Sequence, residues 1–575
     1  MDDIKGNVME FINSCGKSNN DLYNEFDPRI RRYLIPKSIL WTSVNSGDSV
    51  ENAQTLLEKH SRQITLASEH PCILRNNGDG AGMLLDFGIE IHGSIQIFIC
   101  NCAGAGNSVR IRIRFGESAM EAMSEMNDGK YATNDHSLRD QIIEVGSLSA
   151  PEIGPSGFRF VRIDLVDENS YVEIKSVKGI FIYRDIEYKG NFHCNDERLN
   201  KIWYTGAYTV HLNMQEYLWD GIKRDRLIWV GDMHPEVSAI QAVFGYNEVV
   251  PKSLDLIRDI TPMPQWMNTV SSYSIWWLLI HYGWYMHNGD LEYLREQKEY
   301  MSMLLHMLLG CIGEDNGEHM PETRFLDWAS SGHNQSIHTG LHAMLVMALN
   351  TGADMCKTLG DTALYEKCVE GVIRLRKYKV DCKANKQAAA LTILAGLADP
   401  GEINTNVLAV NGYHGISTFM GYYILQARAM AGDIKDCLDC IRDYWGGMLD
   451  FGATTFWEDF NLDWTMNAEG IDKLVPNGKK DIHGDFGEHC YKGYRKSLCH
   501  GWAAGPTAWL SEHVMGIKIK EPGCRIVEIK PDLGDLEWAE GRYPTPAGVI
   551  EIEHRRDSDG NIKSKINAPK EIKIV

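Results

Sequence analysis

The feature that most constrains the fold is a long stretch of helical patterns, from about residue 195 to residue 515. Roughly a dozen segments in this stretch space their apolar side chains at the period of an α-helix. Loops rich in Trp, Asp, His and Gly join them. We predict that the helices pack in pairs into a closed helical barrel; an irregular α-helical domain is the alternative. Asn195 or Asp196 is expected to cap the first helix.

Strand patterns flank the helical stretch on both sides. From about Lys37 to Tyr188, segments such as SIQIFICNC, VRIRIRFGE and FRFVRIDLV alternate or run apolar, which predicts a β-sandwich. After Gly516 shorter strands return, and this tail is too short for an independent sandwich, so we predict a small β-sheet unit docked on the helices. The predicted fold class is multidomain α+β, with an N-terminal segment (1–36), a β-sandwich domain (37–190), a helical barrel (191–515) and a C-terminal β domain (516–575).

The charge balance excludes some partners. With 58 Lys and Arg against 78 Asp and Glu, the formal net charge of the 575-residue chain is −20. This charge argues against nucleic acid or an anionic membrane as the main partner, because phosphate binding needs a positive surface. It leaves a neutral substrate open. The 15 Trp and 24 Tyr residues make the chain rich in aromatic side chains; much of this will be core, but aromatic faces are also common platforms for sugars.

Cysteine usage and the chain start bear on the compartment. The 14 cysteines show no disulfide-framework spacing, which suits a reducing environment. The start, MDDIKGNVMEF, lacks the basic-then-apolar pattern of a signal peptide, and no apolar run reaches the length of a membrane span. We therefore expect a cytoplasmic location, or a secreted or periplasmic one if a native signal was removed. A homodimer is an open expectation.

One stretch, DGIKRDRLIWVGD, concentrates charge in thirteen residues, Asp220–Asp232. The charges follow no helical face, while Leu227, Ile228 and Val230 favour burial. Buried carboxylates must be paired or hydrogen-bonded, and Arg224 and Arg226 are close by in sequence. Such a cluster drives the pKa values of its members apart, as acid–base chemistry requires. A dense charged surface loop is the alternative.

A second candidate lies about 220 residues further on, in GATTFWEDFNLDW. Glu458 follows Trp457, and a carboxylate flanked by Trp is a plausible base in a sugar site. The alternative is a helix start in which Glu458 completes a capping box with Thr455. Further polar–aromatic stretches are SLCHGWAAGP with His500, TRFLDWASSGHNQ with Asp327, Trp328 and His333, and NGYHGIS with Tyr413 and His414. Metal and nucleotide fingerprints are absent, so we predict no metal and no cofactor.

What remains is an aromatic-rich helical domain with several carboxylate loops, and paired Asp and Glu side chains are the working groups of glycoside hydrolysis. At these residues the chain resembles the α-L-rhamnosidases of glycoside hydrolase family 78. Asp220–Asp232 is similar to the family's motif D-C-P-x-R-(D)-E-R-x-G-W-x-G-D, 452–458 to its G-A-T-T-x-W-E motif, and 497–500 to its S-L-x-H motif. The resemblance extends over roughly residues 40–570, and the first two motifs are long and specific.

The resemblance implies a central (α/α)6 barrel and inverting hydrolysis of terminal α-L-rhamnosides. One carboxylic acid protonates the leaving oxygen, and a carboxylate ~6.5–9.5 Å away activates water on the opposite face of the sugar. Carried over to this chain, Asp225 stands at the position of the acid and Glu458 at that of the base. The residues that would bind the sugar or line its pocket are Asp220, Arg224, Trp229, Asp232, Trp457 and His500.

The chain departs from the motif at the acid, where Asp225 replaces the usual Glu, and at Gly221–Ile222, which replace C-P. The Asp carboxyl sits ~1–1.5 Å further back, and misplacement on that scale can cost ~10²-fold in rate. Asp225 in a shifted loop remains our preferred acid; Glu236 and Glu322 are alternatives. A non-catalytic sugar-binding protein and another (α/α)6 enzyme, acting on a charged sugar, are the rival functions.

Overall fold

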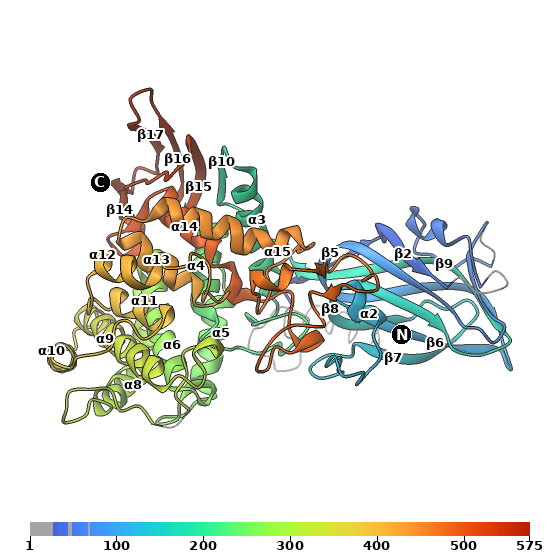
Figure 1. Cartoon of the computed structure of the whole chain (residues 1–575), viewed down its shortest axis with the longest axis horizontal. Helices are drawn as coiled ribbons and strands as arrows, with labels where there is room; N and C mark the ends of the chain where they lie inside the picture. Colours follow the sequence, from blue (N-terminus) through green and yellow to red (C-terminus); the bar gives the residue numbers. More distant parts are fainter. Residues whose placement is uncertain (1–26, 44–48, 67–68, 322) are drawn as a thin grey trace, which may run out of the picture.

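The computed structural model describes residues 27–43, 49–66, 69–321 and 323–575. A β-domain lies on one side of a large helical domain, and a smaller group of strands lies at the far end of the helices (Figure 1). The predicted fold class is confirmed in all three parts. Most of the expected N-terminal segment, residues 1–26, lies outside the described residues.

The N-terminal β-domain is built from one nine-stranded antiparallel sheet within the described residues. Its main path runs β3-β4-β9-β5-β8-β6-β7, while β1 pairs with β9 and β2 with β5. Alternating side chains of these strands, such as Leu85, Ile97 and Ile111, gather in one apolar core. The strands are β1 (Arg29–Leu34), β2 (Ser38–Thr42), β3 (Val50–Glu51), β4 (Cys72–Asn76), β5 (Ala81–Ala103), β6 (Ser108–Gly116), β7 (Asp140–Gly146), β8 (Glu152–Leu165) and β9 (Ser170–Arg184).

The first strand and one short helix complete the β-domain. Strand β1 begins at Arg29, eight residues before the predicted start of the domain, and runs antiparallel to the end of β9. A short helix, α2 (Ala119–Met123), follows β6, and the hydroxyl of Ser118 caps it by accepting a hydrogen bond from the Glu121 amide. Helix α2 lies at the end of the β-domain that faces the helices (Figure 1).

The helical domain follows the predicted periodicity. Asp196 caps its first helix by accepting hydrogen bonds from the amides of Arg198 and Leu199, as the sequence predicts. Large indoles fill the interior, and Trp203, Trp277 and Trp445 are completely buried. The helices are α3 (Glu197–Asn213), α4 (Met233–Val243), α5 (Val249–Asp259), α6 (Ser271–Asn288), α7 (Leu291–Glu296), α8 (Lys298–Gly310), α9 (Asn334–Thr358), α10 (Thr362–Leu375), α11 (Lys386–Leu394), α12 (Pro400–Ile403), α13 (Gly421–Met430), α14 (Ile434–Cys440), α15 (Gly446–Asp450) and α16 (Gly505–Trp509). No helix in the described ranges is long and apolar enough to cross a membrane.

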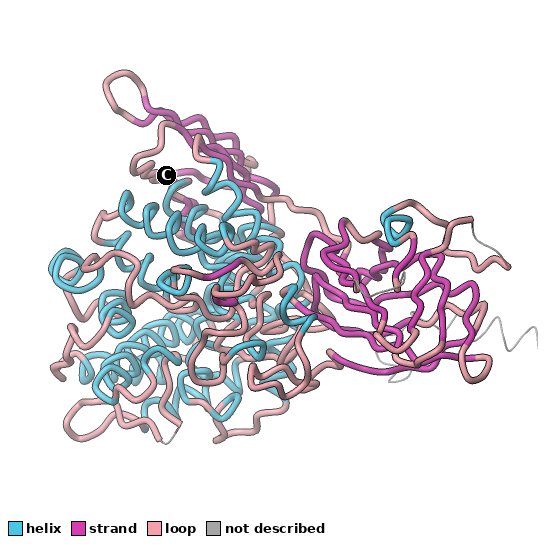
Figure 2. The backbone as a smooth tube through the Cα atoms, turned by 45° about the vertical axis from the view of Figure 1, so that its right-hand side comes forward, coloured by secondary structure: helices cyan, strands magenta, loops and turns pink. Residues whose placement is uncertain are grey.

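The C-terminal strands form two small sheets, seen as the strand cluster beside the helices in Figure 2. One has the order β10-β15-β16-β17, and the other β13-β14-β18. Strand β10 (Asn191–Cys194) precedes the first helix, so this sheet joins the two ends of the helical domain. The other strands are β13 (Ile517–Ile519), β14 (Ile526–Ile529), β15 (Trp538–Thr545), β16 (Gly548–Arg556), β17 (Ile562–Asn567) and β18 (Lys573–Ile574).

The sheet that contains β16 has a buried face and an exposed face. Substitutions of neighbouring residues of β16 should therefore destabilise the protein by very different amounts. Ile550 is fully buried, while Glu551 faces solvent. We expect Ile550→Ala to destabilise the protein by about 2–5 kcal/mol, because it leaves a cavity. The matched change Glu551→Ala should stay within about 0.5 kcal/mol. Urea denaturation followed by fluorescence measures both; equal effects would contradict the assigned register.

Candidate active site

The stretch Asp220–Asp232 is a compact loop between α3 and α4. Asp220 folds it back on itself: its amide donates to the Leu227 carbonyl at 3.1 Å, and its Oδ1 accepts from the Leu227 amide at 2.9 Å. The loop is tied to the SLCH stretch because the Gly501 amide donates to the Asp220 carbonyl at 2.9 Å. Gly221 is required at this contact, since a Cβ there would lie 2.7 Å from the Arg224 carbonyl oxygen. The loop is therefore a folded unit that is buried only in part: Val230 is buried as predicted, whereas Leu227 is 50% exposed and its predicted burial is wrong.

Glu458 lies in a loop that has no helix start, so the capping-box interpretation is wrong. The Thr455 hydroxyl instead donates to the Leu498 carbonyl at 2.7 Å. The Glu458 backbone pairs with Ser497, whose amide also donates to Glu458 Oε2 at 2.8 Å. The other carboxylate oxygen, Oε1, accepts from Arg224 Nη2 at 2.6 Å. Both oxygens of this buried carboxylate are thus fixed by short, charge-assisted or backbone hydrogen bonds.

Arg224 joins the two motifs, because its other terminal nitrogen, Nη1, lies 3.5 Å from Asp225 Oδ1. Burial opposes the charge on Arg224, but the carboxylates of Glu458 and Asp225 outweigh it and raise its pKa. The Asp225 side chain is 18% exposed, against 4% for Glu458. Trp229 Nε1 donates to Asp225 Oδ2 at 3.1 Å, and His136 Nε2 lies 3.4 Å from Oδ1. The two candidate catalytic carboxyls therefore face two nitrogens of one guanidinium.

The sequence analysis did not find His136. It belongs to the β-domain, in the loop before β7, and it has no neighbouring motif. A polar residue in a loop gives no periodic signal, and its partner is 89 positions away in sequence. Only the packing of the β-domain against the acidic loop brings the imidazole to Asp225.

A second group of polar side chains is centred on Asp232. Asp232 Oδ2 lies 3.2 Å from His500 Nε2, and the Tyr273 hydroxyl donates to Asp232 Oδ1 at 3.3 Å. Burial raises the pKa of both Asp220 and Asp232. Burial alone would lower the pKa of His500, but the carboxylates of Glu458, Asp232 and Asp220 raise it to about 9. The raised pKa favours the imidazolium form of His500 near neutral pH, in which the Nδ1 proton would have no hydrogen-bond partner among the described residues.

A cavity of about 520 Å³ opens beside Glu458. Its lining brings together stretches that the sequence analysis singled out separately: Asp327, Trp328, His333, Tyr413, His414 and Glu458. The aromatic walls are Trp328, Phe419, Phe460, Trp464, Tyr491 and Trp502. The cavity is large enough for a sugar ring and offers the apolar faces and convergent polar groups typical of such sites.

The predicted role of Trp457 as a pocket wall is wrong. Its side chain is completely buried and packs edge-on against Phe460, with ring centroids 5.5 Å apart. The cavity lining begins one residue later, since Glu458, Asp459, Phe460 and Asn461 line the cavity while Trp457 lies in the core. Arg224, Asp225, Trp229 and His500 lie next to Glu458 or behind it, outside the lining of this cavity.

Asp459 is a carboxyl of the cavity whose role the sequence analysis left unassigned. Burial, and the neighbouring carboxylate of Glu458, raise its pKa to about 6, against the attraction of Lys496. Lys496 is itself completely buried, lies 4.5 Å from the centre of the Trp464 ring, and has a pKa lowered by burial to about 8. Asp459 thus titrates close to neutral pH while exposed to the cavity.

Glu236 and Glu322 are the alternative acids that the sequence offers in place of Asp225. Glu236 in α4 is completely buried against Gly501, and its carboxyl oxygens have no hydrogen-bond partner among the described residues. Burial raises its pKa well above the usual value, so it is a neutral group of the core. Glu322 lies outside the described residues.

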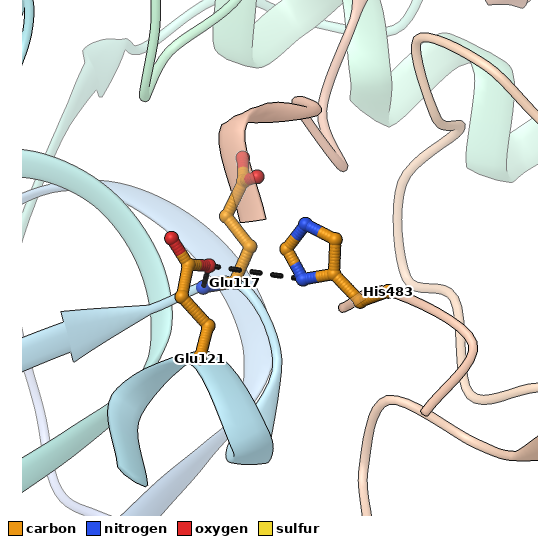
Figure 3. Close-up of side chains that lie close together, drawn as sticks. All are labelled: Glu117, Glu121 and His483. Carbon is orange, nitrogen blue, oxygen red and sulfur yellow. Dashed lines mark hydrogen bonds and ion pairs between the residues drawn. The ribbon is translucent and has the colours of Figure 1, made fainter. Parts of the chain in front are cut away.

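One group in the described part of the chain has the side chains to hold a metal ion: Glu117, Glu121 and His483, all buried (Figure 3). Lys223 already supplies a cation there, with Nζ 2.9 Å from Glu117 Oε2 and 3.2 Å from Glu121 Oε1. Both His483 nitrogens have partners, since Nδ1 lies 2.8 Å from the Ser118 hydroxyl and Nε2 lies 3.0 Å from the Lys496 carbonyl oxygen. The group is an ion cluster around an ammonium.

Comparison with known proteins finds similarity to the family that the three motifs resemble. Residues 187–378 match the bacterial α-L-rhamnosidase six-hairpin glycosidase domain, and residues 516–574 match the bacterial α-L-rhamnosidase C-terminal domain. An α-L-rhamnosidase of Alteromonas sp. (strain LOR) is 24% identical over 452 residues, which cover 70% of this chain and 46% of that protein. The chain spans about half the length of this curated relative.

Solved structures show the same fold. A family GH78 rhamnosidase of Bacillus sp. GL1 superposes with a TM-score of 0.71 at 22% identity, covering 91% of this chain and 55% of that one. A rhamnosidase from Klebsiella oxytoca with rhamnose bound gives a TM-score of 0.66 at 17% identity, covering 84% of this chain and 96% of that one. A Streptomyces avermitilis α-L-rhamnosidase complexed with L-rhamnose gives 0.66 at 18% identity, covering 86% and 48%.

The raised pKa of His500 predicts a pH-dependent stability. Its folded pKa of about 9 exceeds the usual 6.5, so its contribution is complete below about pH 6.5 and is lost as the pH rises through about 9. In His500→Gln this contribution, up to a few kcal/mol, is missing at every pH. The difference in melting temperature between wild type and variant should be largest near pH 6. It should shrink towards alkaline pH; a constant difference would contradict the imidazolium.

Proposed function

We propose that this chain, which carries the six-hairpin glycosidase and C-terminal domains of the bacterial α-L-rhamnosidases, hydrolyses terminal α-L-rhamnosides or related deoxy-sugar glycosides with inversion. The observation that carries the proposal is the Glu458 carboxylate at the wall of an aromatic, sugar-sized cavity, fixed by Arg224 and the Ser497 amide. A carboxylate held in this way is oriented before substrate binds, and such orientation supplies much of the rate of an enzyme.

Glu458 is the general base of the proposed reaction. It would take a proton from a water that lies between its carboxylate and the anomeric carbon and that attacks this carbon. Arg224 and Ser497 each use one lone pair of the carboxylate, so both oxygens keep a further acceptor site for that water. The aromatic walls Trp328 and Trp502 would pack on the apolar faces of the sugar.

Asp225 is the proposed general acid. It lies across the Arg224 guanidinium from Glu458, so the anomeric carbon would lie over Arg224, with the glycosidic oxygen towards Asp225 and the attacking water towards Glu458. Trp229 Nε1 donates to Asp225 Oδ2, whereas Arg224 and His136 lie 3.5 and 3.4 Å from Oδ1, which has no hydrogen-bond partner among the described residues. Oδ1 is therefore the oxygen that would face the leaving group.

Asp459 is a second candidate for the acid, favoured by one observation. It lines the cavity, and its pKa of about 6 leaves roughly a tenth of the carboxyl protonated at pH 7. If Asp459 is the acid, activity falls as the pH rises through about 6, because the proton donor is lost. Its position next to Glu458 in sequence weighs against it, since an inverting pair acts from opposite faces of the ring.

The lining of the cavity also bears on the rival functions. Its carboxyl side chains, Asp327, Glu458, Asp459 and Glu488, would repel an acidic sugar and outnumber its one ammonium, Lys386; its imidazoles are His333, His414 and His489. A neutral deoxy sugar fits this electrostatics better than a uronic acid does. A non-catalytic sugar-binding protein would need the cavity but not the buried Arg224–Glu458 pair, whose desolvation costs stability.

Kinetics on an aryl α-L-rhamnoside test the proposal. We expect wild type to release L-rhamnose and Glu458→Gln to lose about 10³-fold in kcat, because the base is gone. Of Asp225→Asn and Asp459→Asn, the variant that lacks the acid should lose about 10²-fold or more. Asp463→Asn is the matched control, because its carboxylate lies in the same stretch, 47% exposed and outside the cavity lining.

Two outcomes contradict the proposal. Full activity in both Glu458→Gln and Asp225→Asn would remove the two-carboxylate site. Calorimetry that shows L-rhamnose binding by wild type, together with no turnover of any aryl rhamnoside, would establish the sugar-binding protein instead.

A further inference from the structure

Lys223 is a buried ammonium at the boundary between the β-domain and the site loops. Its Nζ lies within hydrogen-bond distance of four oxygens: Glu117 Oε2 at 2.9 Å, Glu121 Oε1 at 3.2 Å, and the carbonyls of Tyr494 and Lys496 at 2.9 and 2.8 Å. Burial opposes its charge, but the two carboxylates outweigh it and raise the pKa of the ammonium. Two of its partners belong to the β-domain and two to the loop that precedes His500.

Glu117 also binds the loop that precedes His500 directly. Glu117 Oε2 also accepts from the Leu498 amide at 2.6 Å. Glu121 is fixed at the start of α2, where its Oε2 accepts from the Glu117 amide at 2.8 Å. Figure 3 shows Glu117 and Glu121 entering from the β-domain and His483 from the opposing loop. His483 lies 3.0 Å from the Lys496 carbonyl oxygen, which is a further tie between the same two parts.

These contacts flank the residue that orients the candidate base. Ser497 lies between Lys496, whose carbonyl binds Lys223, and Leu498, whose amide binds Glu117. The Ser497 amide donates to Glu458 Oε2, and its carbonyl accepts from the Glu458 amide at 2.9 Å. Lys223 also directly precedes Arg224, which binds the other oxygen of Glu458. Arg224 and Ser497, which make the two hydrogen bonds to the Glu458 carboxylate, are thus each next in sequence to a residue that contacts Lys223 or Glu117.

The β-domain approaches Lys223 closely. A Cβ at Gly157 of β8 would lie 2.7 Å from the Lys223 amide nitrogen, so a side chain at position 157 would push the two parts apart. The Ser137 hydroxyl donates to the Lys223 carbonyl at 3.0 Å. The main chain at Lys223 is therefore held in place along with its side chain.

We propose that Lys223 is a positioning residue, through which Glu117 and Glu121 of the β-domain hold Arg224 and Ser497 on the Glu458 carboxylate. The β-domain is then part of the catalytic apparatus, although it supplies no group to the wall of the cavity beside Glu458. The effect on catalysis rests on the proposed function, whereas the effect on the loop does not. A lysine here is a property of this chain, at a position that the family motif leaves variable.

Lys223→Met removes the cation but leaves two buried carboxylates without it, which can prevent folding. The neutral variant Lys223→Met/Glu117→Gln/Glu121→Gln avoids that cost and still lacks the ionic tie. Glu248→Gln is the matched control, because it breaks another contact between the two domains, with Arg184 of β9, and touches neither site loop. Circular dichroism and melting temperature establish that each variant is folded.

Hydrogen exchange measures positioning without using activity. We expect amide exchange in residues 494–500 to accelerate at least about tenfold in the neutral variant and to stay unchanged in Glu248→Gln. On an aryl α-L-rhamnoside, kcat should fall about 10²-fold with KM within about threefold, as expected when a reacting group is misplaced.

Unchanged exchange in the folded neutral variant would overturn the proposal, and so would an unchanged kcat in the presence of an active wild type. A loss of kcat in Glu248→Gln equal to that in the neutral variant would also overturn it, because any domain contact would then have the same effect. If wild type has no activity on rhamnosides, the proposed function fails, while the exchange result still decides whether Lys223 holds the loop.

Discussion

The structure of the site depends on one buried ion pair, between Arg224 and Glu458, whose atoms lie 2.6 Å apart. The partners are 234 positions apart in sequence. Arg224 lies in the connection from α3 to α4, and Glu458 lies in the loop after α15, so the pair forms only when the helical domain closes. Burying two charges is costly, and their attraction repays the cost only when geometry and further hydrogen bonds are good. Here Ser497, Asp225 and the loop backbone provide them, which is consistent with a site that uses stability to orient a carboxylate.

Much of the fold follows from local patterns in the sequence. Alternation in β5 and β8 and the helical spacing from α3 onward identify the elements, and Asp196 identifies a helix start. Pairings between distant segments do not follow from the sequence. Strand β1 pairs with the end of β9, and β10 completes a sheet whose other strands lie more than 340 residues later. These pairings are non-local, and short edge strands such as β10 carry too few residues for a clear period.

The candidate site, like the fold, follows from the sequence where motifs are local and does not where distant segments meet. The motifs identified Asp220, Arg224, Asp232, Glu458 and His500, and the structure brings these residues together. Trp457 was assigned to the cavity, although the lining begins only at Glu458, and the irregular backbone of this loop has no period from which the sequence could show where the lining starts. His136 and the carboxylates that bind Lys223 come from the β-domain, in which the sequence analysis named no site residue. Their contribution depends on how two domains pack, and a pattern within one segment carries no record of that packing.

The central claim is that Arg224 holds two carboxylates on opposite sides of one bound sugar. A crystal structure of Glu458→Gln with an uncleaved aryl α-L-rhamnoside tests it most directly. The account predicts the rhamnosyl ring where the cavity of about 520 Å³ meets Glu458, with the anomeric carbon over Arg224 and a water between that carbon and the substituted side chain at position 458. It also predicts the Asp225 carboxyl within hydrogen-bond distance of the glycosidic oxygen on the other face of the ring. A sugar bound away from position 458, or with Asp225 and position 458 on the same face, would contradict it.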